Sequence, residues 1–160
     1  MGNNTNNIST DERASILKEF EQRKKLWEEL RINGDNSVLY NDLKANHIVG
    51  TQRGIYAPMI ESLGKRVAKR LLSTGTVYKD LNKGGYMFYD FPNTTIKKYD
   101  ENEIDAMINS MKYRLPLFVV FGNVNDGEKR MIMVGTVTGI DNESKTFKVR
   151  LENEFPHDIP

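Results

Sequence analysis

The chain has 160 residues, of which 38% are hydrophobic and 28% are charged, and its formal net charge is +1. These values are ordinary for a soluble globular protein of one domain, and no apolar run approaches the roughly 18 to 20 residues that a membrane helix needs. Cysteine is absent and the two histidines lie far apart, which excludes disulfides, thiolate zinc sites and histidine-rich metal sites. The Asn-rich N-terminus lacks the apolar stretch of a secretory signal, so none is expected there. We therefore expect a cytoplasmic protein without a metal or another cofactor.

The N-terminal part of the chain is predicted to be mainly helical. Residues 1–8 are expected to form a disordered tail. Ser9 and Glu12 have the spacing of a capping box, and apolar residues then recur at helical intervals, so a helix is predicted from about Thr10 to Ile32. A shorter helix is predicted from about Ser37 to Asn46. Its expected buried residues are Val38, Leu39 and Leu43.

The next segment, from Ile48 to Tyr56, consists of two short apolar pieces around a glycine-bounded polar loop. This loop presents Gln52 and Arg53, whose side chains are suited to base edges or phosphate groups. The same residues also fit a simple turn without any binding role. The segment is therefore a candidate nucleic-acid contact, with a plain turn as the alternative.

The rest of the chain is predicted to consist mainly of strands. Residues 60–72 fit both helical spacing and a strand, and we favour a strand from about Arg66 to Ser73. The tail from Glu152 to Pro160 shows no periodicity and is expected to be a linker to a missing C-terminal domain. The other expected elements are a strand from Tyr86 to Phe91, a helix from Asp100 to Lys112, and strands from Leu115 to Phe121, Met131 to Gly139 and Thr146 to Leu151.

Residues 73–92 hold the most informative pattern, because aromatic rings, acids and a Gly84-Gly85 turn crowd into one hairpin-sized segment. The rings and acids are Tyr78, Tyr86, Phe88, Tyr89, Phe91, Asp80 and Asp90. From Gly64 to Lys83 there are six bases and one acid, a net charge of +5; the bases are Lys65, Arg66, Lys69, Arg70, Lys79 and Lys83. Flat rings, hydrogen-bonding acids and clustered positive charge suit a nucleobase and its phosphates. From the residues alone, the rings could also fill a core and the bases form a solvated face.

This hairpin resembles the SRA (YDG-type) domains, which read modified cytosine in DNA and belong to the PUA-like barrel group. The matching residues are Tyr78, Asp80, Gly84, Gly85, Tyr89 and Asp90. The similarity extends to SRA-like domains that precede an HNH nuclease in bacterial restriction-type proteins. The stretches that carry this wider similarity are Gly50 to Tyr56, Leu71 to Leu81, Asp100 to Ile104 and Leu115 to Val120.

The resemblance implies an α+β fold, in which N-terminal helices pack on a twisted, partly closed mixed β-barrel. Residues 9–151 are expected to form this domain. It implies a reader of double-stranded DNA that flips a modified base, of the 5-methylcytosine or 5-hydroxymethylcytosine type, into an aromatic pocket. The chain would then be the specificity module of a restriction endonuclease and would have no catalytic residues of its own. The full-length protein could form a homodimer. The expected pocket residues are Tyr78, Asp80, Tyr89 and Asp90. The expected contacts to the DNA backbone or groove are Gln52, Arg53, Lys65, Arg66, Lys69, Arg70, Lys79 and Lys83.

The chemistry of base flipping is consistent with these residues. Unstacking a base costs a few kcal/mol, and two facing tyrosines can return roughly 1 to 3 kcal/mol per stacked ring. Asp80 can accept a hydrogen bond from the exocyclic amine of cytosine. Because strand residues alternate between faces, Tyr89 and Asp90 cannot both enter one pocket unless the strand bends, and we expect Tyr89 to be the stacking residue.

Two other function classes stay open at this point. An RNA-binding PUA-type module would use the same barrel and aromatic residues on unpaired bases. A protein-interaction or dimerisation domain would use the amphipathic helix from Thr10 to Ile32.

Overall fold

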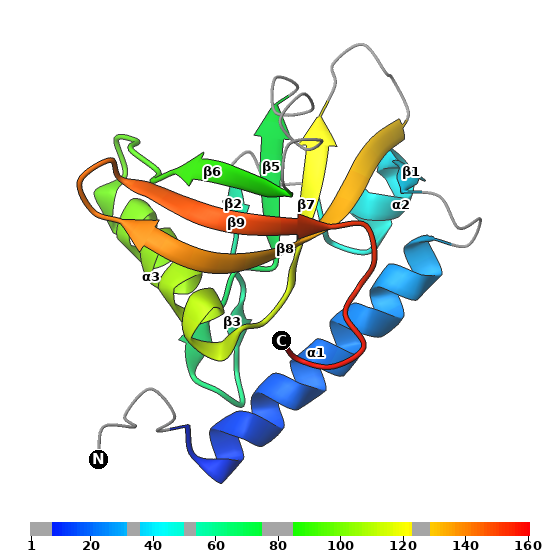
Figure 1. Cartoon of the computed structure of the whole chain (residues 1–160), viewed down its shortest axis with the longest axis horizontal. Helices are drawn as coiled ribbons and strands as arrows, with labels where there is room; N and C mark the ends of the chain where they lie inside the picture. The colour runs from blue at the N-terminus through cyan, green and yellow to red at the C-terminus, as the bar shows by residue number, and fades with distance from the viewer. Residues whose placement is uncertain (1–7, 32–35, 50–53, 75–84, 123–128) are drawn as a thin grey trace.

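The computed structural model of the chain describes residues 8–31, 36–49, 54–74, 85–122 and 129–160 (Figure 1). Within these ranges the chain forms three helices, one large mixed sheet and one small two-stranded sheet, which confirms the α+β class. The helices are α1 (Thr10–Leu30), α2 (Tyr40–Ala45) and α3 (Lys97–Tyr113). The strands are β1 (Ser37–Leu39), β2 (Ile55–Tyr56), β3 (Met59–Ile60), β4 (Lys65–Arg66), β5 (Arg70–Thr74), β6 (Tyr86–Asp90), β7 (Leu117–Gly122), β8 (Lys129–Asp141) and β9 (Thr146–Glu152).

The large sheet is strongly curved, and its strand order is β2-β5-β7-β8-β9-β6, with β1 added beside β8. Strands β5 and β7 are parallel, and the other neighbours are antiparallel. The long β8 pairs with β1 and β7 in its first half and with β9 in its second half, where the register shifts between Val137 and Gly139. In Figure 1, β6, β9 and β8 cross in front of β5 and β7. The sheet therefore forms the partly closed barrel that the resemblance implied.

The main hydrophobic core lies between the two halves of the curved sheet and includes helix α3. Ala106 and Met107 of α3 are fully buried in the same cluster as Leu117, Val119 and Val149 of the strands. This helix begins at Lys97, earlier than the predicted start at Asp100. Asp100 lies in its first turn, where its carboxylate accepts hydrogen bonds from the backbone and hydroxyl of Thr94, each at 2.7 Å. Helix α3 thus closes one side of the core.

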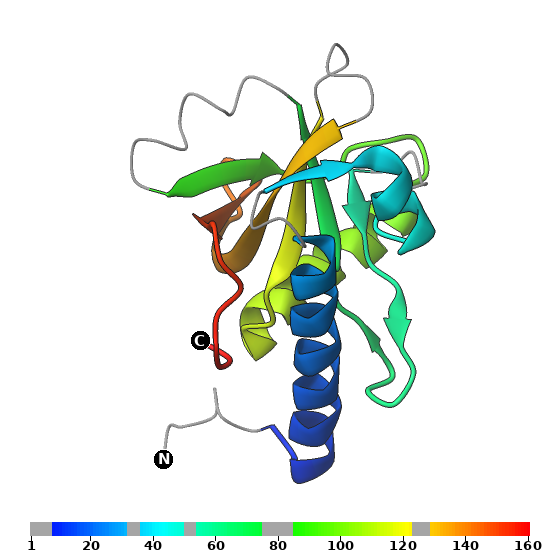
Figure 2. The same cartoon turned by 90° about the vertical axis from the view of Figure 1, so that its right-hand side faces the viewer.

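Helix α1 forms an outer layer beside the sheet (Figures 1 and 2). The predicted capping box is present, because the Ser9 hydroxyl accepts from the Glu12 backbone and the Glu12 carboxylate accepts from the Ser9 backbone. The buried guanidinium of Arg23 donates to the carbonyl oxygens of Ala68 at 2.8 Å and Pro116 at 2.9 Å. These bonds tie the middle of α1 to the chain segments that enter β5 and β7.

Residues 153–160 run back along α1 (Figure 1). The Phe155 ring lies 5.3 Å from the ring of Phe20, 6.5 Å from that of Trp27 and 6.4 Å from that of Phe118, measured between centroids. The segment that the sequence predicted to be a linker is therefore packed onto the domain, because its one aromatic side chain completes a cluster. A further domain after this segment stays a prediction.

Two segments differ from the predicted elements. The predicted helix from Ser37 to Asn46 is strand β1 followed by helix α2, and Leu39 is exposed instead of buried. The predicted strand from Arg66 to Ser73 is divided into β4, which pairs with β3, and β5, which enters the large sheet. Strands β1 and β5 pair with β8 and β7, which lie far along the chain, so local periodicity could not reveal these pairings. Strand β4 instead forms a short hairpin with the preceding β3.

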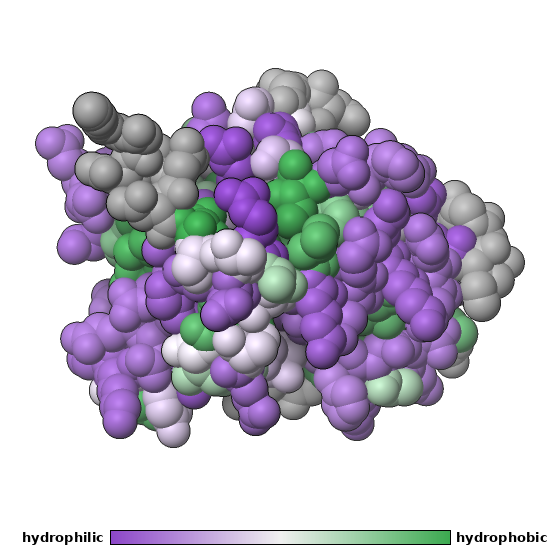
Figure 3. Space-filling model, turned by 90° about the horizontal axis from the view of Figure 1, so that it is seen from below, coloured by the Kyte–Doolittle hydropathy of each residue, from purple (hydrophilic) through white to green (hydrophobic). Residues whose placement is uncertain are grey.

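The outer surface is mainly polar where α1 turns away from the sheet. Seen from below, hydrophilic residues dominate the face and apolar residues form small separate patches (Figure 3). Among the described residues, none of the helices combines the length and the apolar character required to cross a membrane.

Candidate functional site

The two end strands of the large sheet, β2 and β6, approach each other at Gly54 and Tyr89. Gly54 directly precedes β2, and a Cβ atom added to it would overlap the hydroxyl group of Tyr89 in β6. The carbonyl oxygen of Gly54 accepts from the Leu72 backbone at 2.8 Å, which fixes this glycine to β5. Only a residue without a side chain permits this approach. We call this meeting point of β2 and β6 the seam.

Tyr89 lies partly buried at the seam and packs against the main core. Burial is the largest cause that raises the pKa of Tyr89 to about 12, and the nearby charge of Arg70 acts in the opposite direction. The carboxylates of Glu103 and Asp90 raise this pKa further. The phenol therefore stays neutral at physiological pH and can offer both a stacking face and a hydroxyl group.

The side chains of β6 alternate as the sequence predicted. Met87 and Tyr89 point toward the core, whereas Phe88 is 67% exposed and Asp90 is also exposed. The register between β6 and β9 runs without a shift, pairing Tyr89 with Phe147 and Asp90 with the next residue of β9. The strand therefore does not bend between Tyr89 and Asp90, and their side chains lie on opposite faces. A pocket around Tyr89 would not include the Asp90 side chain.

The described basic residues predicted to contact DNA do not share one face. Arg70 is fully buried, with its guanidinium carbon 5.6 Å from the ring centroid of Tyr56, which corrects its placement on an outer basic surface. Lys69 is partly buried, and this burial lowers its pKa. Arg66 is exposed and donates from Nη1 to the carbonyl oxygen of Ala57 at 3.0 Å. The break between β4 and β5 separates these side chains, so Arg66 alone among them keeps an exposed position.

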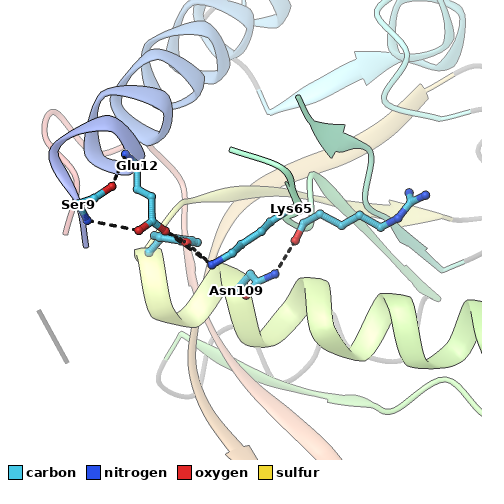
Figure 4. Close-up of polar contacts among 6 residues, drawn as sticks. Ser9, Glu12, Lys65 and Asn109 are labelled. Atoms are coloured by element: carbon cyan, nitrogen blue, oxygen red, sulfur yellow. Dashed lines mark hydrogen bonds and ion pairs between the residues drawn. The ribbon is translucent and has the colours of Figure 1, made fainter. Parts of the chain in front are cut away.

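Lys65 belongs to a different cluster, near the N-terminus of α1 (Figure 4). Its Nζ atom donates to the Tyr113 hydroxyl at 3.1 Å and lies 3.6 Å from Oε2 of Glu12. The Tyr113 hydroxyl donates to the same Oε2 atom at 2.6 Å, and this bond is the largest cause that lowers the pKa of Glu12 to about 2. Asn109 donates to the Arg66 carbonyl oxygen at 2.9 Å. The cluster ties α1, β4 and α3 together, which is a structural role.

A hollow of about 320 Å³ opens between β2, β4 and the first half of α3. We call it the α3 pocket; its lining residues are Ile55, Tyr56, Ala57, Arg66, Tyr99, Asn102 and Glu103. Sequence reasoning did not identify Tyr99, Asn102 and Glu103 as site residues. Asn102 and Glu103 follow Tyr99 by three and four residues, which places all three on one face of a helix. This spacing is the sequence feature that could have indicated a shared site.

Six predicted site residues lie outside the described residues, and they include half of the predicted base pocket. They are Gln52, Arg53, Tyr78, Lys79, Asp80 and Lys83. Within the described ranges, the side chains of His, Asp and Glu do not gather in groups of three or more that could hold a metal ion.

No protein-family model matches the chain, and no curated protein matches it. Solved structures do resemble it. The SUVH5 SRA domain in complex with fully methylated CG DNA aligns with a TM-score of 0.50 and 19% identity, covering 76% of this chain and 88% of that chain. SUVH6 from Arabidopsis thaliana in complex with SAM aligns with a TM-score of 0.51 and 18% identity, covering 78% of this chain and 26% of that chain. The chain therefore has the fold of an SRA domain, as the sequence resemblance implied.

Proposed function

We propose that this chain is a DNA-binding domain that recognises a modified cytosine by taking the base, swung out of the duplex, into a pocket beside Tyr89. The proposed pocket residues are Tyr78, Asp80 and Tyr89, with Tyr89 as one stacking ring. We further propose that the domain is the specificity module of a restriction endonuclease, whose catalytic centre and homodimer contacts would belong to the full-length protein.

The observation that carries this proposal is the seam. Two segments that are separated by 29 residues, Gly54 to Tyr56 and Tyr86 to Asp90, come together there, and both belong to the motifs that resemble SRA domains. The related fold gives further support, because the SUVH5 SRA domain was crystallised with methylated DNA. A neutral, partly buried phenol beside a glycine is also a suitable wall for a flat, uncharged ring.

The stacking role of Tyr89 can be tested against its neighbour in the same strand. Replacing Tyr89 by Ala removes the ring that faces the core side of β6, and replacing Phe88 by Ala removes the ring that faces outward. Affinity would be measured for otherwise identical duplexes carrying cytosine, 5-methylcytosine or 5-hydroxymethylcytosine. We expect the unaltered domain to prefer a modified duplex, and Tyr89→Ala to weaken that binding about tenfold or more, since one stacked base contributes roughly 1 to 3 kcal/mol.

Phe88→Ala is the matched control and should keep both the affinity and the preference. Equal affinity of the unaltered domain for all three duplexes would refute the reading of a modified base. Tighter binding to a structured RNA than to every duplex would favour an RNA-binding module instead. Circular dichroism of both variants separates a lost contact from an unfolded domain.

A further inference from the structure

The α3 pocket lies beside the seam but does not include Tyr89, so the proposed base pocket leaves it without a role. We propose that it binds a second nucleotide, one that flanks the modified base and carries an exocyclic amino group. This inference rests on the proposed function, because the nucleotide would belong to the DNA that the domain is proposed to bind. The pocket itself is defined by the described residues alone.

The pocket offers aromatic surface. Tyr56 of β2 and Tyr99 of α3 both contribute to its lining, and Tyr99 is 51% exposed although it lies in a hollow. An accessible ring in a concave surface can stack on any nucleobase, because every base has a π face. The volume of about 320 Å³ is at the lower end of the range for small-molecule sites, as a single nucleotide requires.

The charges in the pocket select for a ligand with two kinds of polar group. The lining holds one cation, the exposed residue Arg66, and one anion, Glu103, which is 8% exposed and whose charge also acts on the buried Arg70. A simple anion would meet the carboxylate, and a simple cation would meet the guanidinium. A nucleotide fits both, with its phosphate near Arg66 and the amino group of its base near Glu103.

The position of the pocket fits a flanking nucleotide. Gly54 touches Tyr89 at the seam, and Tyr56, two residues later along an extended segment, lines the pocket. Two residues of extended chain span about 7 Å, and neighbouring bases on one DNA strand are about 3.4 Å apart along the helix. One end of a three-residue segment would therefore contact the flipped base, and the other end would contact a nucleotide close to it.

The first experiment uses free nucleotides and needs no modified DNA. The isotope-labelled domain is titrated with dCMP, dTMP or inorganic phosphate while the backbone amide signals are followed by NMR. We expect dCMP to shift the signals of Tyr56, Asn102 and Glu103, and to bind about fivefold or more tightly than dTMP, which lacks an exocyclic amine. Tyr99→Ala should weaken the binding of both nucleotides about fivefold or more. Phe88→Ala removes an exposed ring outside the pocket and should leave the affinity for both nucleotides unchanged.

Glu103→Gln tests the amino-group contact, and its spectrum shows directly whether the domain is still folded. We expect this variant to bind dCMP and dTMP with nearly equal affinity. If Glu103→Gln is unfolded, Asn102→Ala takes its place and should reduce the preference for dCMP. The proposal is overturned if dCMP leaves the pocket signals unchanged, if phosphate alone shifts them as strongly, or if dTMP binds as tightly as dCMP.

The second experiment separates this proposal from the proposed function. Duplexes with one modified cytosine are varied at the adjacent positions between thymine and the three amino-bearing bases. Loss of the flanking preference in Glu103→Gln, with the preference for modified cytosine retained, is the expected result. A domain that binds dCMP in the α3 pocket but does not distinguish modified from unmodified duplexes would refute the base-reading function and leave this pocket assignment standing. Retention of the flanking preference in Glu103→Gln would overturn the proposed role of the pocket in DNA recognition.

Discussion

The centre of the large sheet and its two ends are built differently. The central strands β7 and β8 bury residues such as Val119 and Ile132 completely, with the barrel core on one side and the layer of α1 and α2 on the other. At the ends, β2 has two residues and β6 exposes Tyr86 and Phe88 on its outer side. The comparison indicates that the centre supplies most of the stability. The end strands β2 and β6 have few neighbours to cover them, so exposed surface and the α3 pocket stay accessible for binding there.

A substitution at the centre should have the largest effect on folding. A Cβ atom at Gly135 of β8 would lie 2.8 Å from Cγ2 of Val119, 2.9 Å from Cγ1 of Val149 and 3.1 Å from Cδ1 of Leu117. These side chains are buried and cannot yield easily, so we expect Gly135→Ala to lower the free energy of unfolding by about 2 to 3 kcal/mol. Urea denaturation measures this change.

Gly139 of the same strand is the matched control for Gly135. Its nearest neighbour would be Cβ of Lys148 at 3.6 Å, an ordinary contact, so Gly139→Ala should change stability by much less. Equal losses in the two variants would show that the centre is not packed more tightly than the bulged part of β8.

A substitution at the seam should lower the free energy of unfolding less than Gly135→Ala does, but it should weaken DNA binding. Gly54→Ala places a methyl group against the Tyr89 hydroxyl, which is the end of a side chain that can move. We expect a loss of about 1 kcal/mol in the free energy of unfolding and about tenfold weaker binding to modified DNA, because Tyr89 leaves its stacking position. Denaturation and duplex-binding assays measure the two effects.

Tyr89→Phe sharpens this prediction, since it removes the overlapping hydroxyl and keeps the ring. The next ring atom would lie 3.5 Å from the added Cβ, so Gly54→Ala should be nearly neutral in the Tyr89→Phe background. Equal effects of Gly54→Ala in both backgrounds would contradict the contact at the seam.

The smallest expected effect lies at the outer layer and depends on pH. The pKa of Glu12 is lowered from 4.5 to about 2, first by the hydrogen bond from Tyr113. Because the folded-state pKa lies below the unfolded value, the ionised carboxylate stabilises the fold fully above pH 4.5, and this contribution is lost as the pH falls toward 2. The stability difference between the unaltered chain and Glu12→Gln should therefore shrink over that interval in denaturation measured at several pH values.

Glu21→Gln provides the comparison for Glu12, because Glu21 is exposed on the same helix. This variant should show no comparable change with pH. A difference between Glu12→Gln and the unaltered chain that stays constant from pH 5 to pH 2 would contradict the role of the Tyr113 bond.

Local patterns predicted much of the fold. The capping box at Ser9, the helices α1 and α3, and the strands β6 to β9 depend on nearest neighbours and on periodicity, so the sequence alone indicated them. The alternation of Met87 and Tyr89 with Phe88 and Asp90 was predicted for the same reason. Strand β1 was missed because it depends on the distant strand β8. The division between β4 and β5 was missed because β4 pairs with the nearby β3 whereas β5 pairs with β7, and the spacing of residues 66–73 does not distinguish these partners.

The candidate site was predicted in parts and not as an arrangement. Sequence patterns indicated both Tyr89 and the segment that ends at Tyr56, but they could not show that the ends of a curved sheet bring the two together. The same patterns treated Arg70 as a surface charge, whereas the structure buries it beside Tyr56. Glu103 belongs to the stretch from Asp100 to Ile104 that resembles the SRA-like domains, but the sequence did not indicate that it lines the α3 pocket.

By itself, the sequence determined which residues are chemically able to hold a nucleobase and which local elements carry them, because propensity and side-chain chemistry act over a few residues. Which of these residues lie together depends on the packing of the whole chain. The curvature of the sheet and the packing of α3 against it set the distances between segments far apart in the chain, and these distances determine what the surface can bind.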